Sequence, residues 1–353
     1  MLVDAVRDFA LRACRPAALA ADAACSTPSE LLATATELGL GAIGIPARYG
    51  GVLEQRATVT AALVAEALAE GDMGIALACL APGAVATALG LWGDAAQQSA
   101  YLPALAGETP PVAALALAEP RVLFDPFALQ TQARRGAAGD YVLDGAKALV
   151  PRAVEAKLLI VAAALDGRPS LFIVEAGSAG MTATPQPGMG VRAAATGSLS
   201  LEGVKLPATA LLGESDPQAY RKLVALGRLG WCALAVGTGQ AVLDYVSAYV
   251  NQRVAFGEPI SNRQSVAFMV ADIAIELESL RLATYRAAGL AETGRDFIRE
   301  AALARALAAR HAMQIGADGV QLLGGHGYTK EHPVERWYRD LRAAGMLEGA
   351  LLL

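Results

Sequence analysis

The spacing of apolar positions changes twice along the chain. In residues 1–112, apolar side chains such as Leu31 and Ala35 recur three and four positions apart, which predicts helices. Residues 113–213 instead hold short apolar or β-branched runs between turn signals, which predicts strands. Helical spacing returns in longer segments in residues 214–353, which is typical of a helical bundle. The pattern therefore predicts a multidomain α+β protein with an N-terminal helical domain, a middle β domain and a C-terminal helical bundle.

One segment of the N-terminal stretch, residues 73–92, carries no charged side chain and is long enough to cross a membrane. Pro82 and Gly83 lie in its middle. Because proline and glycine interrupt helices, we expect two buried helices joined by a turn at this pair, and no membrane span.

Composition limits the kinds of partner. The 353 residues include 29 Lys and Arg against 34 Asp and Glu, so the formal net charge is −5 and gives no general attraction to nucleic acid or an anionic membrane. The 4 cysteines form no CxxC pair, so we expect four buried free thiols, with no metal site and no disulfide framework. The first residues mix charged and apolar side chains, unlike a signal peptide, so a cytoplasmic protein is expected.

Several common catalytic patterns are missing. The run Gly324-Gly325-His326-Gly327 lacks the GxGxxG order and a preceding strand, which disfavours a Walker or Rossmann nucleotide site. No histidine lies in an HExxH motif and no serine in a nucleophile elbow, which disfavours metal-dependent hydrolysis and a serine triad. What remains is a set of polar and glycine residues in the otherwise apolar C-terminal stretch: Arg253, Phe256, Gly257, Gln264, Gln321, Gly324 to Tyr328, Arg336, Arg339, Asp340, Arg342, Glu348 and Gly349.

Taken in order, these residues resemble the pattern of the acyl-CoA dehydrogenases. The strongest segments are residues 253–264 and 321–348, where the family's QxxGGxGY run continues without a gap to the final Glu-Gly pair. Weaker similarities lie at residues 37–51, 101–120, 143–147 and 204–213. The resemblance implies a helical domain, a β-sandwich-like middle domain and a C-terminal four-helix bundle. It also implies a dimer of dimers with FAD at the subunit interfaces, acting in fatty acid or steroid side-chain catabolism.

The resemblance further implies catalytic roles. Dehydrogenation of an acyl-CoA thioester needs a base for the α-proton and an acceptor for the β-hydride. Glu348 lies at the family's base position, and its backbone N–H would bond the thioester carbonyl. Arg228 lies where many members have an arginine that could orient that base, although it could equally be a solvated helix arginine. FAD would accept the hydride, and electron-transfer flavoprotein would take the electrons onward.

The cofactor-binding candidates implied by the resemblance are Arg253, Phe256, Gln264, Gln321, Gly324, Gly325 and Gly349. Arg253 and Gln264 correspond to contacts with the FAD pyrophosphate, a role suited to a planar cation and an amide. Gln321, Gly324 and Gly325 correspond to positions where the backbone approaches the adenosine half, and a larger side chain would block that approach. In the family these residues reach a flavin held mainly by a neighbouring subunit.

Two segments of the predicted middle domain depart from the family's pattern. Residues 118–125 read AEPRVLFD where TEPGxGSD is usual, and residues 147–151 read KALVP where KxWIT is usual, so hydroxyl groups that would bond the flavin ring are absent. Three hypotheses stay open. The chain is a working acyl-CoA dehydrogenase in which backbone groups replace those contacts, or a partner subunit of a heteromeric dehydrogenase that supplies one half of a shared FAD site, or a catalytically inactive homologue.

Overall fold

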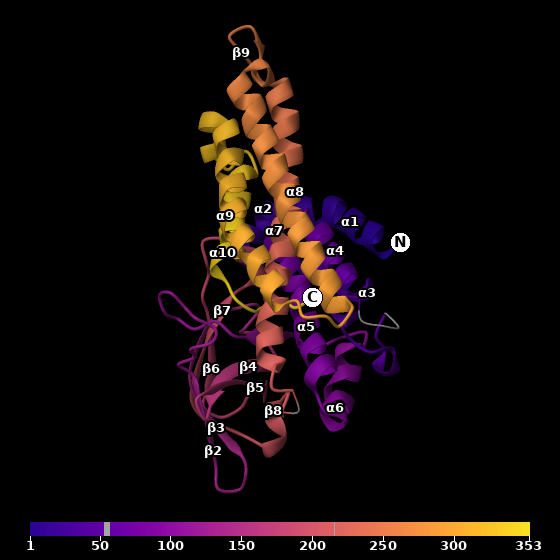
Figure 1. Cartoon of the computed structure of the whole chain (residues 1–353), viewed down its shortest axis with the longest axis vertical. Coiled ribbons are helices and arrows are strands. Elements are labelled where there is room, and N and C mark those ends of the chain that lie inside the picture. The colour runs from indigo at the N-terminus through magenta and orange to yellow at the C-terminus, as the bar shows by residue number, and fades with distance from the viewer. Residues whose placement is uncertain (53–56, 215) are drawn as a thin grey trace.

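The chain folds into helical, β and helical parts in sequence order, and the computed structural model describes residues 1–52, 57–214 and 216–353 (Figure 1). The first part holds α1 (Leu2–Phe9), α2 (Arg15–Ala24), α3 (Ser29–Glu37), α4 (Thr58–Ala69), α5 (Met73–Trp92) and α6 (Ala95–Leu105). The middle part holds β1 (Ala113–Ala116), β2 (Gln132–Arg135), β3 (Tyr141–Val150), β4 (Leu158–Leu165), β5 (Arg168–Glu175), β6 (Met181–Pro185), β7 (Gly197–Leu206) and β8 (Leu211–Leu212). The last part holds α7 (Ala219–Gln252), β9 (Val254–Ala255), β10 (Glu258–Pro259), α8 (Gln264–Glu292), α9 (Ile298–Leu322) and α10 (Val334–Met346). The predicted fold class is confirmed, and we propose domain boundaries in the gaps after α6 and after β8.

Helix α5 runs without interruption from Met73 to Trp92, so the predicted turn at Pro82-Gly83 is wrong. Asp72 starts the helix by accepting a hydrogen bond from the Ile75 N–H at 3.0 Å. Most of the helix is buried, and this packing holds it together although Pro82 removes one internal hydrogen bond. Gly83 serves close packing, because a Cβ there would lie only 3.4 Å from the Leu40 carbonyl oxygen.

The same helix is the one in the described residues that is long and apolar enough to cross a membrane by length and composition alone. The mean hydropathy of its most apolar 18-residue window is 1.9, and 78% of that window is buried inside the protein. Burial of this extent is typical of the core helix of a globular fold.

The strands of the middle part form one eight-stranded sheet in the order β6-β7-β3-β2-β4-β5-β8, with β1 added in parallel to β4. All residues of β4 are buried, and its side chains alternate between two cores. Leu158 and Ile160 join the core shared with α5, while Leu159 and Val161 join a second core with residues of β3 and β7. The ring centroids of Tyr141 on β3 and Phe172 on β5 lie 5.2 Å apart. Because these strands are three places apart in the sheet, the sheet folds over itself like a sandwich.

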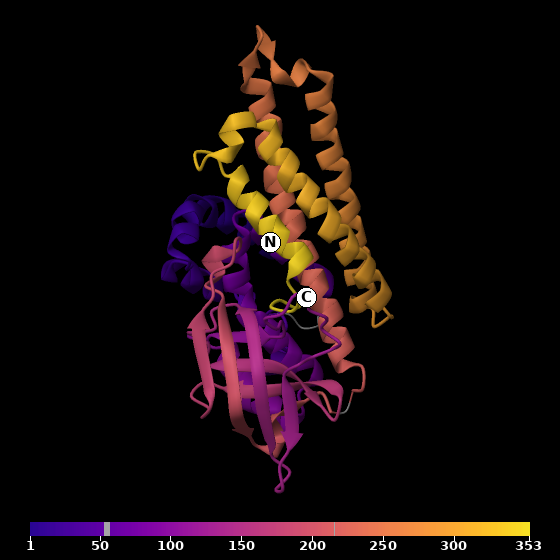
Figure 2. The ribbon, with the colours of Figure 1, turned by 90° about the vertical axis from the view of Figure 1, so that its left-hand side faces the viewer.

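Helices α7 to α10 form the C-terminal bundle, with α7 as its longest member (Figure 2). On α8, Ile273, Leu277 and Leu280 are fully buried, at the three- and four-residue spacing of an amphipathic helix. The bundle extends away from the sheet, so that one end of α7 lies beside the middle part and the other end carries the β9–β10 hairpin (Figures 1 and 2).

The cysteines are all free thiols, as predicted, but one of them is not buried. Cys14, Cys79 and Cys232 are buried, whereas Cys25 is half-buried. Cys25 ends α2 in a left-handed conformation with φ 52°. Helix ends of this kind turn the chain at the surface, which explains the exposure that the sequence pattern did not indicate.

A buried polar junction joins α10 to the other two parts of the chain. The Asp72 carboxylate that caps α5 also accepts a hydrogen bond from Arg336 Nε of α10 at 3.1 Å. One turn later, Asp340 Oδ1 accepts the backbone N–H of Val191, from the middle part, at 2.6 Å. Burial, followed by the charge of Asp72, raises the pKa of Asp340 to about 8. The junction fixes the helix that leads directly to Glu348.

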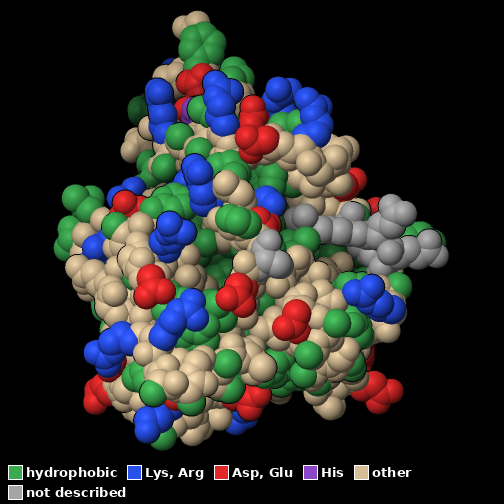
Figure 3. Space-filling view, turned by 60° about the horizontal axis from the view of Figure 1, so that its bottom comes forward, with side chains coloured by type: hydrophobic (Ala, Val, Ile, Leu, Met, Phe, Trp, Pro, Cys, Tyr) green, Lys and Arg blue, Asp and Glu red, His purple; other side chains and the backbone are tan. Residues whose placement is uncertain are grey.

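Charged side chains of both signs are interspersed on the face shown in Figure 3, without a broad area of one sign. This distribution agrees with the small negative net charge of −5. The face therefore offers no extended basic surface of the kind that binds nucleic acid.

Candidate active site

Glu348 and Arg228 form a nearly buried ion pair between the bundle and the middle part. Arg228 Nε lies 3.1 and 3.2 Å from the two carboxylate oxygens of Glu348, and Arg228 Nη2 lies 2.9 Å from Oε1. The side chains are 10% exposed for Glu348 and 21% for Arg228. Arg228 is thus not a solvated helix arginine. A guanidinium in this bidentate arrangement holds the carboxylate in one orientation.

The turn that carries Glu348 depends on a glycine. Helix α10 ends at Met346, and Gly349 has a left-handed φ of 70°. A Cβ on Gly349 would lie 2.8 Å from the Leu117 Cβ, so only glycine fits without displacing Leu117, the residue after β1. The Gly349 carbonyl accepts the Trp231 indole N–H at 2.8 Å, which ties the turn to α7. Glu348 therefore projects from a segment fixed on both sides.

A loop of the middle part covers the ion pair. The Phe127 ring lies 6.0 Å from the Arg228 guanidinium carbon and edge-on to the Tyr220 ring, with centroids 6.1 Å apart. The Tyr220 hydroxyl donates a hydrogen bond to the Pro126 carbonyl oxygen at 2.5 Å. Burial, followed by nearby carboxylates, raises the pKa of Tyr220, so this hydroxyl stays neutral. These contacts keep bulk water away from one side of Arg228.

Four of the predicted cofactor residues gather at the far end of the bundle. Arg253, Gln321, Gly324 and Gly325 line a hollow of about 650 Å³. No atom lies within 4 Å of the position of a Cβ on either glycine. The Arg253 and Gln321 side chains are exposed and make no hydrogen bond or ion pair with the rest of the described chain. An open glycine surface beside a free guanidinium and amide fits a phosphate-bearing group.

The remaining cofactor candidates lie elsewhere. Phe256 is at the tip of the β9–β10 hairpin, 96% exposed, with its ring 5.6 Å from the Arg263 guanidinium carbon. Gln264 is the first residue of α8 and is exposed. Neither residue lines the hollow of Arg253. Gly349 lies beside Glu348, where its conformation shapes the turn.

The hollow lies at the C-terminal end of α7, beside Tyr249 and Arg253, whereas Glu348 pairs with Arg228 in the first third of that helix. Arg228 and Arg253 are 25 residues apart (253 − 228) along this helix and its C-cap. At the rise of an α-helix, this separation is roughly 37 Å. The two groups of predicted residues are therefore well separated within one chain.

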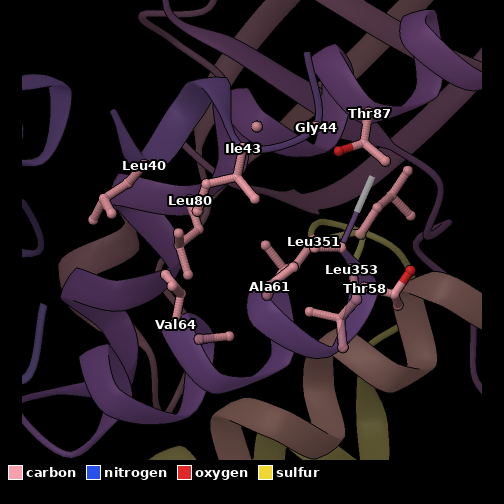
Figure 4. A pocket seen from close by; sticks show the side chains of 14 residues that line it. Leu40, Ile43, Gly44, Thr58, Ala61, Val64, Leu80, Thr87, Leu351 and Leu353 are labelled. Atoms are coloured by element: carbon pink, nitrogen blue, oxygen red, sulfur yellow. The ribbon is translucent and has the colours of Figure 1, made fainter. Parts of the chain in front are cut away.

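A small cavity of about 30 Å³ lies between α4, α5 and the segment after Glu348 (Figure 4). Its walls are mostly apolar and include Val64, Leu80 and Leu351. Thr58 Oγ1 also faces this region, and it is buried without a hydrogen-bond partner among the described residues. The cavity is large enough for one or two water molecules, and Leu351 connects it to the turn that carries Glu348.

Family models match all three parts of the chain. The acyl-CoA dehydrogenase N-terminal domain matches residues 1–109, the middle domain matches residues 114–204, and the C-terminal domain matches residues 218–351. The chain belongs to the acyl-CoA dehydrogenase family. The resemblance inferred from the sequence is therefore confirmed.

Relatives of known identity agree with this assignment. The mitochondrial short/branched chain specific acyl-CoA dehydrogenase of Rattus norvegicus is 32% identical, over 99% of this chain and 82% of its own length. The structure of butyryl-CoA dehydrogenase from Megasphaera elsdenii has a TM-score of 0.89 and 30% identity, covering 99% of this chain and 93% of that one. A Mycobacterium smegmatis glutaryl-CoA dehydrogenase in complex with FADH2 has a TM-score of 0.87 and 26% identity, covering 99% and 90%. The relatives are oxidoreductases, and FAD is the cofactor that these comparisons support.

The two segments that depart from the acyl-CoA dehydrogenase pattern lie side by side. The Ala148 N–H donates to the Ala118 carbonyl oxygen at 2.9 Å, and the Leu149 N–H donates to Gln186 Oε1 at 2.9 Å. Both backbone donors are therefore used within the chain. They cannot replace the missing hydroxyl groups toward a flavin unless these hydrogen bonds break.

The residues that match the family in these segments form a buried ion pair. Lys147 Nζ lies 3.0 Å from Glu119 Oε1 and 3.2 Å from the Leu117 carbonyl oxygen. The side chains are 0% exposed for Lys147 and 3% for Glu119. Burial lowers the pKa of Lys147 to about 8, and the Glu119 charge opposes this shift. Because Leu117 packs against Gly349, the pair supports the wall behind the turn of Glu348.

Lys147→Met is expected to lower the free energy of unfolding by about 3–5 kcal/mol, because it leaves the Glu119 charge buried without its partner. Chemical denaturation followed by tryptophan fluorescence measures the change. Adding Glu119→Gln to the first substitution should recover a large part of the loss. Equal losses in the single and double variants would contradict an ionic role for the pair.

The sequence did not indicate every polar residue near Glu348. Lys147 and Glu119 were visible only as matches to the family's pattern, with no sign that they form a pair. Arg305 of α9 was not singled out, although it stands among buried alanines on that helix. A single cation on an apolar helix face is a signal that sequence alone could have supplied.

Proposed function

We propose that this chain is a subunit of an FAD-dependent acyl-CoA dehydrogenase in which Glu348 removes the α-proton of the substrate. The observation that carries the proposal is the Glu348 carboxylate, 10% exposed and held through both oxygens by Arg228. A general base must be oriented toward the proton that it removes, and a bidentate guanidinium holds the Glu348 carboxylate in one orientation. Arg228 is thus proposed to orient the base.

The reaction has two parts, proton removal by Glu348 and hydride acceptance by the cofactor. Glu348 takes the proton as the α C–H bond breaks, and the carbon–carbon double bond forms as the β-hydrogen leaves with its electron pair. FAD supplies the acceptor for that hydride when it is bound. We propose electron-transfer flavoprotein as the next acceptor of the two electrons.

We propose a short or branched acyl-CoA as the substrate. The relative from Rattus norvegicus is named for short/branched chain substrates, and the relative from Megasphaera elsdenii for butyryl-CoA.

The FAD site is proposed to be shared between two chains. Arg253, Gln321, Gly324 and Gly325 would hold the phosphate-bearing and adenosine half of the FAD whose flavin faces Glu348 of another subunit. The separation of roughly 37 Å along α7 supports this division. Gln264 and Phe256 would contribute from the start of α8 and the hairpin tip, and the assembly is proposed to be a dimer of dimers.

A second candidate is a subunit of a heteromeric dehydrogenase, whose unlike partner supplies the flavin-ring contacts. The two altered segments favour it, because their hydroxyl groups are absent and the N–H groups of Ala148 and Leu149 are already used within the chain. In this second candidate, the hollow lined by Arg253 would bind part of the FAD whose flavin lies in the partner subunit.

Flavin content of the chain expressed alone separates the two candidates. If the chain works by itself, the purified protein is yellow, and a short-chain CoA thioester bleaches the flavin absorbance under anaerobic conditions. A colourless protein that becomes yellow only when a second, unlike chain is added would favour the heteromeric candidate. Absence of bound flavin under both conditions would contradict both proposals.

A further inference from the structure

Arg305 lies on α9 in surroundings that do not suit a free cation. Its residue is 9% exposed, and the neighbouring buried positions on α9 are small and apolar, including Ala301, Ala304 and Ala308. A buried guanidinium is costly unless it is paired and hydrogen-bonded. The contacts of Arg305 should therefore show why this helix face carries a charge.

The hydrogen bonds of Arg305 lead to the turn of Glu348. Nη2 donates to the Leu347 carbonyl oxygen at 2.6 Å, whereas Nη1 is buried and has no hydrogen-bond partner in the part of the chain that the structure describes. Burial lowers the pKa of Arg305, and the charge of Glu348 is the leading opposing influence. One neutral oxygen is a poor match for a whole guanidinium, so stability alone does not account for this residue.

The contact between Arg305 and Leu347 also orients the peptide that joins Leu347 to Glu348. Because a trans peptide directs its C=O and N–H to opposite sides, holding the Leu347 oxygen toward α9 turns the Glu348 N–H away from α9. Among the described residues, no acceptor is bonded to this N–H. Arg305 thus fixes a backbone donor next to the proposed base, where a developing negative charge on a thioester oxygen would need one.

We propose that Arg305 is a positioning residue for Glu348. Arg228 holds the carboxylate from α7, and Arg305 holds the preceding carbonyl and adds a second positive charge from α9. The inference rests on the proposed function, since it concerns the same site. It assigns to Arg305 an effect on the chemical step that operates through the backbone of the base.

The test compares Arg305→Met, Arg305→Gln and Arg305→Lys, with Arg281→Met as the matched control. Arg281 is an 18% exposed arginine of the same bundle that pairs with Glu66 and Glu278, away from Glu348. Turnover per bound flavin, KM for a short-chain CoA thioester and thermal stability are measured for each variant. Arg305→Met should lower kcat by about 10²-fold, because a misplaced base loses its alignment, with KM changed by less than about threefold. Arg305→Lys should recover at least about tenfold of that loss through its own donor.

A purely structural role predicts a different result. In that case Arg305→Met and Arg281→Met would both lower thermal stability while kcat per bound flavin stays within about twofold of wild type, which would overturn the inference. A kcat for Arg305→Lys as low as that of Arg305→Met would overturn it as well. If Arg305→Met fails to fold, Arg305→Gln decides. Glutamine can donate to the Leu347 oxygen but carries no charge. Its kcat is therefore expected to be lower than that of wild type, by less than about 10²-fold. A kcat equal to that of wild type would contradict the inference.

The variant Glu348→Gln, in an otherwise wild-type chain, distinguishes failure of the proposed base from failure of the inference about Arg305. Full activity of that variant would refute the proposed base, and the inference about Arg305 with it. A large loss in Glu348→Gln combined with unchanged kcat in the Arg305 variants would refute only the positioning role.

Discussion

Glu348→Gln is expected to lower turnover by about 10²- to 10⁴-fold while the protein remains folded and binds flavin. Glutamine keeps an oxygen that can accept a hydrogen bond from Arg228, so the geometry of the pair is largely preserved. It cannot accept the α-proton, however. The nearby carboxylate of Glu119 is no substitute, because it is 3% exposed and paired with Lys147. Proton removal therefore loses its base.

Anaerobic flavin bleaching by a short-chain CoA thioester, followed in a single turnover, measures this loss directly. Glu155→Gln is a suitable control, because Glu155 is a surface carboxylate, 51% exposed, whose pair with Arg152 lies in the middle part. The control should bleach at the wild-type rate. A Glu348→Gln variant that retains most of the wild-type rate would assign the base to another residue.

Mixing Glu348→Gln with Arg253→Glu restores activity that neither variant has alone, if the chain forms its own shared site. The proposed site combines Glu348 of one chain with Arg253 of another. In a mixed pair, one of the two sites then carries both substitutions and the other carries none. Random pairing should therefore return about a quarter of the wild-type activity. The repulsion between the carboxylate introduced by Arg253→Glu and a pyrophosphate is expected to abolish FAD binding in that single variant.

Co-expression of the two chains, with flavin content and turnover measured against each single variant, provides the comparison. Recovery well above the sum of the single variants supports a site shared between identical chains. If two soluble, folded variants recover no activity together, a site shared between identical chains is contradicted. That outcome would favour a site shared with an unlike partner chain.

The sequence predicted the three-part fold correctly but failed at two local features. Apolar periodicity was sufficient for the three parts, because it separates amphipathic helices such as α8 from short buried strands such as β4. It failed at Pro82, where contacts on all sides of α5 preserve a helix that local propensity would interrupt. It also failed at Cys25, where the end of a helix decides exposure.

The sequence predicted individual site residues but not which of them contact one another. The motif order pointed to Glu348 and Arg228, and the structure adds the hydrogen bonds between them. The same motif order grouped Arg253 with Phe256, although the second residue projects from a hairpin tip away from the hollow. Arg305 was missed because it reaches Glu348 through a backbone carbonyl, and such contacts depend on how helices pack.

The turn at Gly349 has a consequence for how substitutions here are interpreted. A mutational scan would find this position intolerant, since any side chain would collide with Leu117 and strain a left-handed backbone. That intolerance would look like the mark of a residue that takes part in chemistry. Steric restriction alone would produce the same result, so such a scan cannot by itself distinguish a position that is indispensable for the shape it permits from one that contacts substrate or cofactor.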